Sequence, residues 1–183
     1  MHEVSLGGTL LDYLSGEQVE RTTYEDLRQA LARMLVEEKG YPAGLLRSRI
    51  EISYVIDGAR ECRTADLAAY GEDGRPLMLV IFCAGAPGTY ERESVAAARL
   101  VSGGPAPLVL VTDTHDAVLL ETSRGRRLAS GMAAVPPWSD LRAKAASVED
   151  WTADQAARQR EERILHAYSG FIKTCCGESC ELK

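Results

Sequence analysis

The spacing of hydrophobic and polar positions predicts a helix early in the chain and a strand after it. Residues 22–38 carry apolar side chains at helical spacing, and Thr22 with Glu25 fits a capping box at the first turn. Gly40 follows where such a helix would end. Residues 50–56 alternate apolar and polar side chains, which is the pattern of a strand with one buried face.

Further apolar segments predict the rest of a sheet and one connecting helix. Residues 62–70 predict a second strand, and residues 77–83 are apolar throughout, as expected of a central strand covered on both faces. Residues 90–101 are rich in alanine and predict a helix. The segments LVLVTD at 108–113 and DAVLLET at 116–122 predict two more strands joined by a turn.

The remaining segments show weaker patterns. Residues 1–21 are mixed and predict an irregular lead-in or a short edge element, and residues 123–140 read as a loop. A long helix is predicted from about residue 148 to 174, with Ser147 and Asp150 placed to cap it. Its second half carries an apolar stripe, so we expect that half to pack on the rest of the domain.

This order of elements predicts an α/β (α+β) fold with a mixed central sheet of about five strands flanked by helices. The helix between the third and fourth strands predicts a right-handed parallel crossover. We expect residues 1–146 to form one domain. Residues 147–183 would add a C-terminal helix and a cysteine-containing tail packed on the same domain.

Composition and charge argue against some classes of binding partner, namely those that need a strongly basic protein or a membrane-spanning segment. The chain has 183 residues, of which 45% are hydrophobic and 26% charged, with a formal net charge of −6. This charge argues against a strongly basic nucleic-acid binder, although a local patch could still bind phosphate. The sequence shows no apolar run of membrane-spanning length and no signal-peptide pattern, so we expect a cytoplasmic protein without a membrane partner.

Three stretches together resemble a known family. They read DYLSGEQVERTTYEDLRQALARMLVEEKGYP at 12–42, ADLAAYGEDGRPLMLVIFCAGAPG at 65–88 and PLVLVTD at 107–113. In this order and spacing the chain resembles the N-terminal domain of the motor (R) subunit of type I restriction enzymes and its stand-alone relatives. That family belongs to the PD-(D/E)xK nuclease superfamily, so the resemblance implies a restriction-endonuclease-like fold.

The resemblance also assigns catalytic positions, several of which have changed. The family's strand aspartate falls on Asp66, and the glutamate of its first helix falls on Glu25. Its second acid and its lysine fall on Phe82 and Ala84. The family's chemistry uses a divalent metal, usually Mg²⁺, which prefers oxygen ligands and activates a water. Positions 82 and 84 share one face of a strand, and that face is apolar here.

We therefore expect a nuclease-fold domain that has lost catalysis and needs no cofactor. Losing a positioned acid or charge costs on the order of 10²–10⁴ in rate, and two such groups are missing. The domain would then be a nucleic-acid-binding or protein-interaction module of unknown oligomeric state. Asp66 would be a catalytic remnant, or simply a strand acid paired with Arg63 or Arg47.

Two alternatives remain open. The first is an active, Mg²⁺-dependent DNA endonuclease that uses Asp66 and Glu25 with a relocated acid, Glu91 or Glu93. The second is a metal- or redox-sensing module at the cysteine tail. The ligands of that site would be Cys175, Cys176 and Cys180, with Cys62 or Cys83 as a fourth. Their spacing matches no zinc or iron–sulfur signature, so thiols without metal are the simpler interpretation.

A basic surface is the remaining candidate site. Arg47, Arg49 and Arg63 lie on the first two predicted strands and could face a phosphate backbone. Ordinary solvated charge is the competing interpretation, because the chain is acidic overall.

Overall fold

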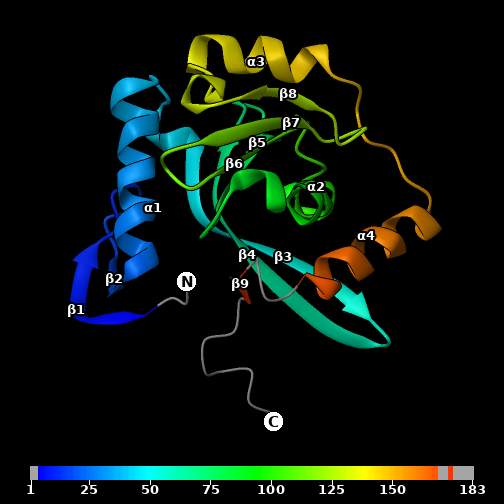
Figure 1. Ribbon diagram of the computed structural model, residues 1–183, viewed down its shortest axis with the longest axis horizontal. Helices are drawn as coiled ribbons and strands as arrows, with labels where there is room; N and C mark the ends of the chain where they lie inside the picture. Colours follow the sequence, from blue (N-terminus) through cyan, green and yellow to red (C-terminus); the bar gives the residue numbers. More distant parts are fainter. Residues whose placement is uncertain (1–3, 169–172, 175–183) are drawn as a thin grey trace.

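A seven-stranded mixed sheet forms the centre of the protein, which a computed structural model describes for residues 4–168 and 173–174 (Figure 1). Its main path runs in the order β3-β4-β5-β6-β7-β8. These strands are β3 (Leu46–Ile56), β4 (Ala59–Tyr70), β5 (Pro76–Phe82), β6 (Leu108–Thr112), β7 (Ala117–Glu121) and β8 (Arg127–Ser130). The short β9 (Lys173–Thr174) pairs with β4. β5 and β6 are parallel, which confirms the predicted crossover, and the α/β fold class is confirmed.

Helices cover both faces of this sheet, and a small hairpin lies beside it. The α-helices are α1 (Thr23–Arg33), α2 (Glu91–Leu100), α3 (Trp138–Ser147) and α4 (Gln155–Ala167). A π-helical turn (Met34–Glu38) continues α1, and 3-10 turns occupy Ala43–Leu45, Pro87–Thr89 and Met132–Ala134. The hairpin consists of β1 (Ser5–Leu11) and β2 (Gln18–Thr22). None of the helices in this described part of the chain is long and apolar enough to span a membrane.

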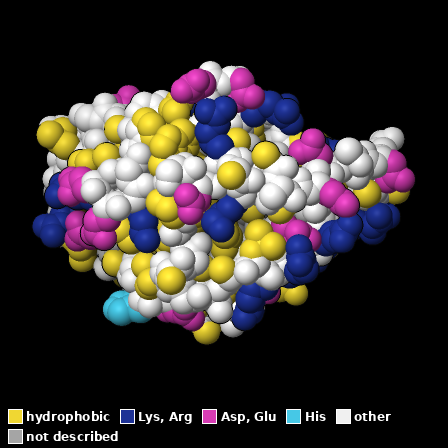
Figure 2. Space-filling model, turned by 90° about the horizontal axis from the view of Figure 1, so that it is seen from above, with side chains coloured by type: hydrophobic (Ala, Val, Ile, Leu, Met, Phe, Trp, Pro, Cys, Tyr) yellow, Lys and Arg dark blue, Asp and Glu magenta, His cyan; other side chains and the backbone are white. Residues whose placement is uncertain are grey.

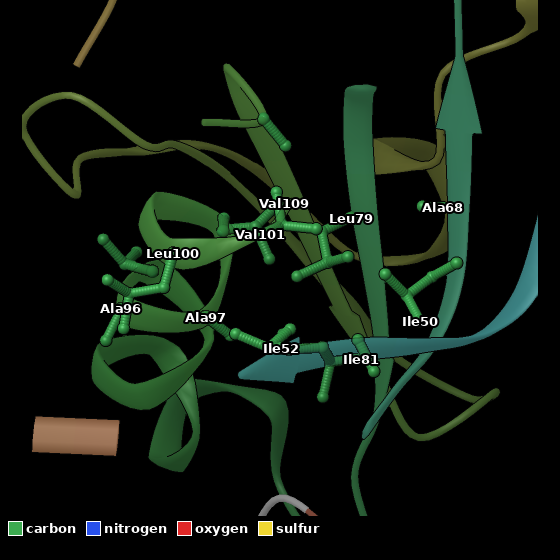
Figure 3. Packing of buried hydrophobic residues seen from close by; sticks show 14 of the residues in the cluster. Ile50, Ile52, Ala68, Leu79, Ile81, Ala96, Ala97, Leu100, Val101 and Val109 are labelled. Atoms are coloured by element: carbon green, nitrogen blue, oxygen red, sulfur yellow. The ribbon is translucent and has the colours of Figure 1, made fainter. Parts of the chain in front are cut away.

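Two hydrophobic clusters lie on opposite faces of the sheet. On β5, Leu79 and Ile81 point toward α2 and α4, whereas Met78 and Val80 point toward α1 and α3. Figure 3 shows the first cluster, in which apolar side chains of the strands meet Ala97 and neighbouring residues of α2. Both faces are apolar because successive strand side chains alternate in direction and helices cover each side.

The prediction of a loop over residues 123–140 was wrong. This segment contains β8 and the start of α3, which follows directly after Pro137. Proline is tolerated at a helix start because the first N–H groups of a helix have no intrahelical partner. The paired prolines therefore mark the start of a helix here.

The last helix begins later than predicted. The carboxylate of Asp154 accepts a hydrogen bond from the N–H of Ala157 and caps α4, so the predicted cap at Ser147 and Asp150 was wrong. Ser147 is instead the last residue of α3. The predicted extension of this helix to residue 174 includes 169–172, which lie outside the described residues.

α4 packs on α2 through a buried charge pair and an apolar contact. Glu161 of α4 forms ion pairs with Arg99 at 2.8 Å and with Arg92 at 2.9 Å. Leu165 is fully buried in the cluster shared by α2 and the strands. These contacts hold α4 against the same domain as the sheet.

The first 21 residues are more regular than predicted. β1 and β2 pair in antiparallel fashion, and the chain turns between them at residues 12–17. Three exposed apolar residues lie in or next to β1: Val4, Leu6 and Leu11. The turn begins at Asp12, which is almost fully buried, so this hairpin contributes a side chain to the site described next.

Candidate functional site

Asp66 lies on β4 next to the end of β5, and it is only 3% exposed. Its Oδ2 accepts a hydrogen bond from the backbone N–H of Phe82 at 2.8 Å. Its Oδ1 accepts hydrogen bonds from Nε and Nη2 of Arg28 at 3.2 and 3.1 Å. The predicted pairing of Asp66 with Arg63 or Arg47 was therefore wrong, because the arginine bonded to it comes from α1.

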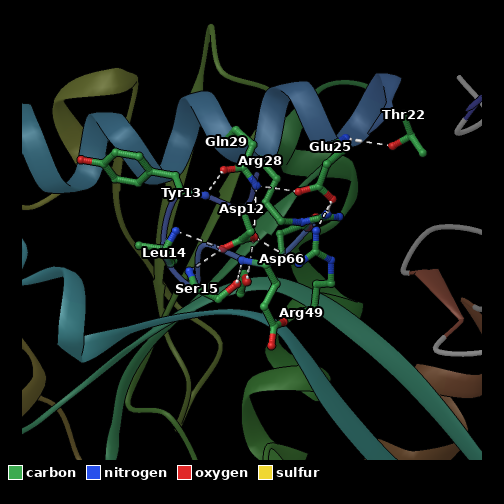
Figure 4. Close-up of polar contacts among 12 residues, drawn as sticks. Asp12, Tyr13, Leu14, Ser15, Thr22, Glu25, Arg28, Gln29, Arg49 and Asp66 are labelled. Atoms are coloured by element: carbon green, nitrogen blue, oxygen red, sulfur yellow. Dashed lines mark hydrogen bonds and ion pairs between the residues drawn. The ribbon is translucent and has the colours of Figure 1, made fainter. Parts of the chain in front are cut away.

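Arg28 connects two acids that come from different elements. It lies one turn after Glu25 on α1, and its Nη1 forms an ion pair with Glu25 Oε2. Figure 4 shows the guanidinium of Arg28 close to both Glu25 and Asp66. Thr22 caps the helix as predicted, since its Oγ1 accepts from the N–H of Glu25 at 3.0 Å. The first turn of α1 thus presents Glu25 and Arg28 to the sheet.

A second arginine and a glutamine extend this cluster to the hairpin. Arg49 of β3 contacts Glu25 Oε2 at 2.7 Å and Asp12 Oδ2 at 3.1 Å. Gln29 donates to Glu25 Oε1 at 2.7 Å and to Asp12 Oδ2 at 3.1 Å. Three carboxylates, from Asp12, Glu25 and Asp66, thus meet two guanidinium groups, from Arg28 and Arg49. The formal charge of the cluster is close to neutral, with one negative charge in excess.

Asp12 is held as a carboxylate. Its Oδ1 accepts from the N–H groups of Leu14 and Ser15 at 3.0 and 2.9 Å, in the turn between β1 and β2. Burial alone would raise the pKa of Asp12. The hydrogen bonds from Ser15, Gln29 and Leu14, together with the charge of Arg49, outweigh burial and lower the pKa to about 2. This acid therefore remains charged at neutral pH.

The residues at this site do not fit a bound divalent metal. The ring of Phe82 packs edge-on against Tyr24 of α1, with ring centroids 5.4 Å apart, and Ala84 has no donor atom. The carboxylates of Asp66 and Glu25 already bind Arg28. Mg²⁺ requires several free oxygen ligands. Within residues 4–168 and 173–174, no group of three or more His, Cys, Asp or Glu residues is arranged to hold a metal.

The two acids considered as replacements lie elsewhere. Glu91 and Glu93 are on α2, which packs on the face of the sheet opposite to α1. Glu91 forms an ion pair with Arg127. Glu93 is fully buried, and neither of its carboxylate oxygens has a hydrogen-bond partner among the described residues. Neither acid supplies a ligand beside Asp66.

The three arginines considered for phosphate binding do not share one surface. Arg47 is exposed and lies 4.4 Å over the ring of Tyr70. Arg49 is engaged by the carboxylates described above. Arg63 is 2% exposed, lies over the ring of Tyr54 and donates to a backbone carbonyl.

Of the five cysteines, the structure describes Cys62 and Cys83. Cys62 is disulfide-bonded, which the sequence did not lead us to expect. Cys83 is a free, buried thiol, and burial raises its pKa to about 11, so it is a poor nucleophile and a poor thiolate ligand at neutral pH. The proposed tail ligands Cys175, Cys176 and Cys180 lie outside the described residues.

Asp12, Arg28 and Gln29 were not predicted as site residues. Arg28 and Gln29 follow Glu25 at spacings of three and four, which place side chains next to each other on a helix. That spacing was a signal for contact with Glu25. Asp12 begins a tight turn, but the sequence carries no signal for the distance between this turn and α1.

Comparison with family models gives a match to the family described as Type I restriction enzyme R protein N terminus, over residues 23–136. The match covers more than half of the chain and includes α1 and the strands β3 to β8. The chain belongs to this family. The resemblance inferred from the three sequence stretches is thereby confirmed, and membership places Glu25, Arg28 and Asp66 inside the matched region.

Among solved structures, the chain is similar to the type IIG restriction endonuclease BpuSI, with a TM-score of 0.40 and 10% sequence identity. The similarity covers 80% of this chain but only 16% of the length of that protein. No curated protein matches the chain.

Proposed function

We propose that this member of the R-protein N-terminal family no longer cleaves DNA and serves as a binding module. The observation that carries this proposal is the position of Arg28, buried between Glu25 and Asp66. Those two acids stand at positions that the family resemblance assigns to metal binding and catalysis. A guanidinium bound to both carboxylates satisfies the charge that a metal would otherwise satisfy.

Electrostatics supports the loss of catalysis. A metal could reach Asp66 only by displacing Arg28, which is 4% exposed. A displaced but still buried guanidinium would lose its partners, which is strongly unfavourable. Phe82 and Ala84 add neither a ligand nor a cation to assist a water. Binding of metal and activation of water are therefore both opposed by this set of side chains.

A cleavage assay tests this proposal. The protein is incubated with supercoiled plasmid and with single-stranded DNA, in Mg²⁺ and in Mn²⁺, beside Asp66→Asn prepared in the same way. We expect no cleavage by the wild-type protein above that seen with Asp66→Asn. Equal residual cleavage in both samples would come from a contaminant. Cleavage by the wild type that Asp66→Asn removes would reject the proposal in favour of an active endonuclease.

Surface charge favours a protein partner over a nucleic acid. Many exposed arginines already bind carboxylates, in the pairs Arg21–Asp26, Arg124–Glu149, Arg126–Glu121 and Arg127–Glu91. Figure 2 shows many basic side chains lying among acidic ones on one face of the molecule. A paired arginine releases fewer counterions on contact with phosphate, and the chain carries a net charge of −6.

DNA binding remains the second candidate because α4 carries free positive charge. Arg160 and Arg163 are exposed, and neither forms an ion pair with another described residue. Fluorescence anisotropy with a labelled duplex at low salt separates the two candidates. A protein-binding module should bind DNA no more tightly than the non-specific range of roughly 10⁻⁴–10⁻⁶ M. Tighter binding that Arg160→Glu with Arg163→Glu abolishes would favour DNA.

A further inference from the structure

The short strand β9 lies on an edge of β4 beyond the end of β5 (Figure 1). β5 pairs with β4 over residues 67–70, and β3 pairs along the opposite edge over residues 59–69. β9 pairs further along the β5 edge, where Thr174 lies opposite Arg63. Residues 173–174 therefore bring a segment close to the C-terminus onto the central sheet.

Cys62 lies next to this pairing, and it is disulfide-bonded. Its partner is not Cys83, because that thiol is free and donates a hydrogen bond to the carbonyl of Gly85 at 3.1 Å. The chain has five cysteines, and the other three are Cys175, Cys176 and Cys180. The partner of Cys62 is therefore one of these three.

We propose that Cys62 is bonded to Cys175, and that this bond is a redox-controlled fastening of the C-terminal segment to β4. The register of β9 carries the assignment. Continued by one residue beyond the described strand, the register that sets Thr174 opposite Arg63 sets position 175 opposite position 62. Opposed residues of an antiparallel pair have Cα atoms about 4.5–5.5 Å apart, which lies within the range of about 4.4–6.8 Å for disulfides.

The same register disfavours the other two cysteines. Cys176 comes one position later, and successive side chains of a strand point to opposite faces. Cys180 is six positions after Thr174, too far along the chain for the register of β9 to place it opposite Cys62. Cys175 is thus the cysteine that the pairing of β9 favours.

Formation of this bond is a two-electron oxidation. The two thiols lose two protons and two electrons, and a low-molecular-weight disulfide accepts them and becomes two thiols. Cys62 is half-buried, so such a reagent can reach it, whereas Cys83 is 2% exposed. In a reducing compartment protein disulfides are rare and are usually transient or redox-sensing. The bond would therefore form and break with the redox state around the protein.

Reduction should loosen the C-terminal segment and destabilise the domain. The bond closes a long loop that contains β5 to β9 and α2 to α4, and such a cross-link lowers the conformational entropy of the unfolded chain. After reduction, β9 would be held by the backbone pairing of two residues. This inference goes beyond the proposed function and does not depend on whether the domain cleaves DNA.

Peptide mapping of the wild-type protein tests the assignment. The protein is equilibrated with oxidised glutathione, its free thiols are alkylated, and it is digested with trypsin. Cleavage after lysine and arginine gives the peptides 61–63 and 174–183, which contain Cys62 and all three candidate partners. We expect these two peptides to be disulfide-linked, with fragmentation placing the bond on Cys175.

Two double variants separate the adjacent cysteines. Cys176→Ser with Cys180→Ser leaves Cys175 in the tail, and it should keep the linked peptides. Cys175→Ser with Cys180→Ser leaves Cys176, and it should lose them.

Thermal unfolding in oxidised and in reduced glutathione tests the fastening. We expect reduction to lower the Tm of the wild type by roughly 5–10 °C. Cys62→Ser should have the same Tm in both conditions. Cys83→Ala is the matched control, because it removes the free thiol and should keep the difference between the two conditions.

Several results would overturn the inference. They are a bond from Cys62 to Cys176 or Cys180, a disulfide-linked dimer, and a wild-type protein without linked peptides in oxidised glutathione. A Tm that does not change when the bond is reduced would also overturn it. None of these results bears on the proposed function, which is rejected by DNA cleavage that Asp66→Asn removes.

Discussion

The side chain of Arg28 determines what the buried cluster can do chemically. Glu25 and Asp66 stand where the family resemblance implies catalytic acids, but both bind this guanidinium. A buried ion pair adds little net stability compared with a well-packed apolar group, whereas one isolated member is strongly destabilising. The three side chains therefore depend on one another, and the loss of one changes the state of the others.

Glu93 is the opposite case, a buried acid without a partner among the described residues. Burial raises the pKa of its carboxyl above the ordinary value of 4.5. A raised pKa means that the protonated form is favoured in the folded protein. The contribution of Glu93 to the free energy of unfolding is therefore largest below pH 4.5. This contribution falls as the pH rises through the raised pKa of the folded protein.

We predict that Glu93→Gln stabilises the protein at pH 8 and has little effect near pH 4. Removing the charge of an unsatisfied buried group should contribute on the order of 1–3 kcal/mol at the higher pH. Urea unfolding at several pH values measures this difference. Glu20→Gln on β2 is the matched control, because Glu20 is exposed and its replacement should be neutral. A destabilising Glu93→Gln at pH 8 would show that the charged form is stabilised in the native protein.

The packing of α4 on α2 depends on ion pairs of Glu161 that the pattern of apolar and polar residues did not predict. Glu161 is buried and binds Arg99, which lies almost entirely inside the interface, and the more exposed Arg92. We predict that Glu161→Ala lowers the free energy of unfolding by about 3 kcal/mol, because Arg99 loses its carboxylate and keeps only neutral partners, the backbone carbonyls of Thr122 and Ser123. Urea unfolding measures the loss, and Arg160→Ala on the exposed side of α4 should cost less than about 0.5 kcal/mol. Equal stability of both variants would argue against a buried pair.

Helices and strands with a strong period were predictable from sequence, and those defined by tertiary contact were not. Residues 22–38 and 77–83 have clear helical and strand patterns, and α1 and β5 form there. β8 has only four residues and is largely exposed, so its sequence lacks the alternation that marks a half-buried strand. α3 buries Leu141 and Ala145, but its apolar stripe is weak. The two prolines before it therefore led to the prediction of a loop.

For the molecule as a whole, the sequence predicted the family, which the match to the family model confirms. It did not predict how the site is neutralised. The assignment of Phe82 and Ala84 to altered positions of the family's motif stays a prediction made from the order of the motifs. The contacts of Arg28 with Asp66 and of Arg49 with Asp12 join residues 38 and 37 positions apart, and only the folded sheet brings them together. Sequence spacing on a helix reports neighbours within a turn, but it does not report partners on another element.

The central proposal is that the guanidinium of Arg28 satisfies the carboxylates of Glu25 and Asp66, so that this site binds no divalent metal. Titration of Mn²⁺ into the wild-type protein by isothermal calorimetry tests it most directly, with Asp66→Asn as the reference. We predict no saturable binding that depends on Asp66 at millimolar Mn²⁺, because Arg28 and Phe82 already satisfy its carboxylate. One-site binding by the wild type that disappears in Asp66→Asn would contradict the claim. It would favour the alternative of a metal-dependent endonuclease.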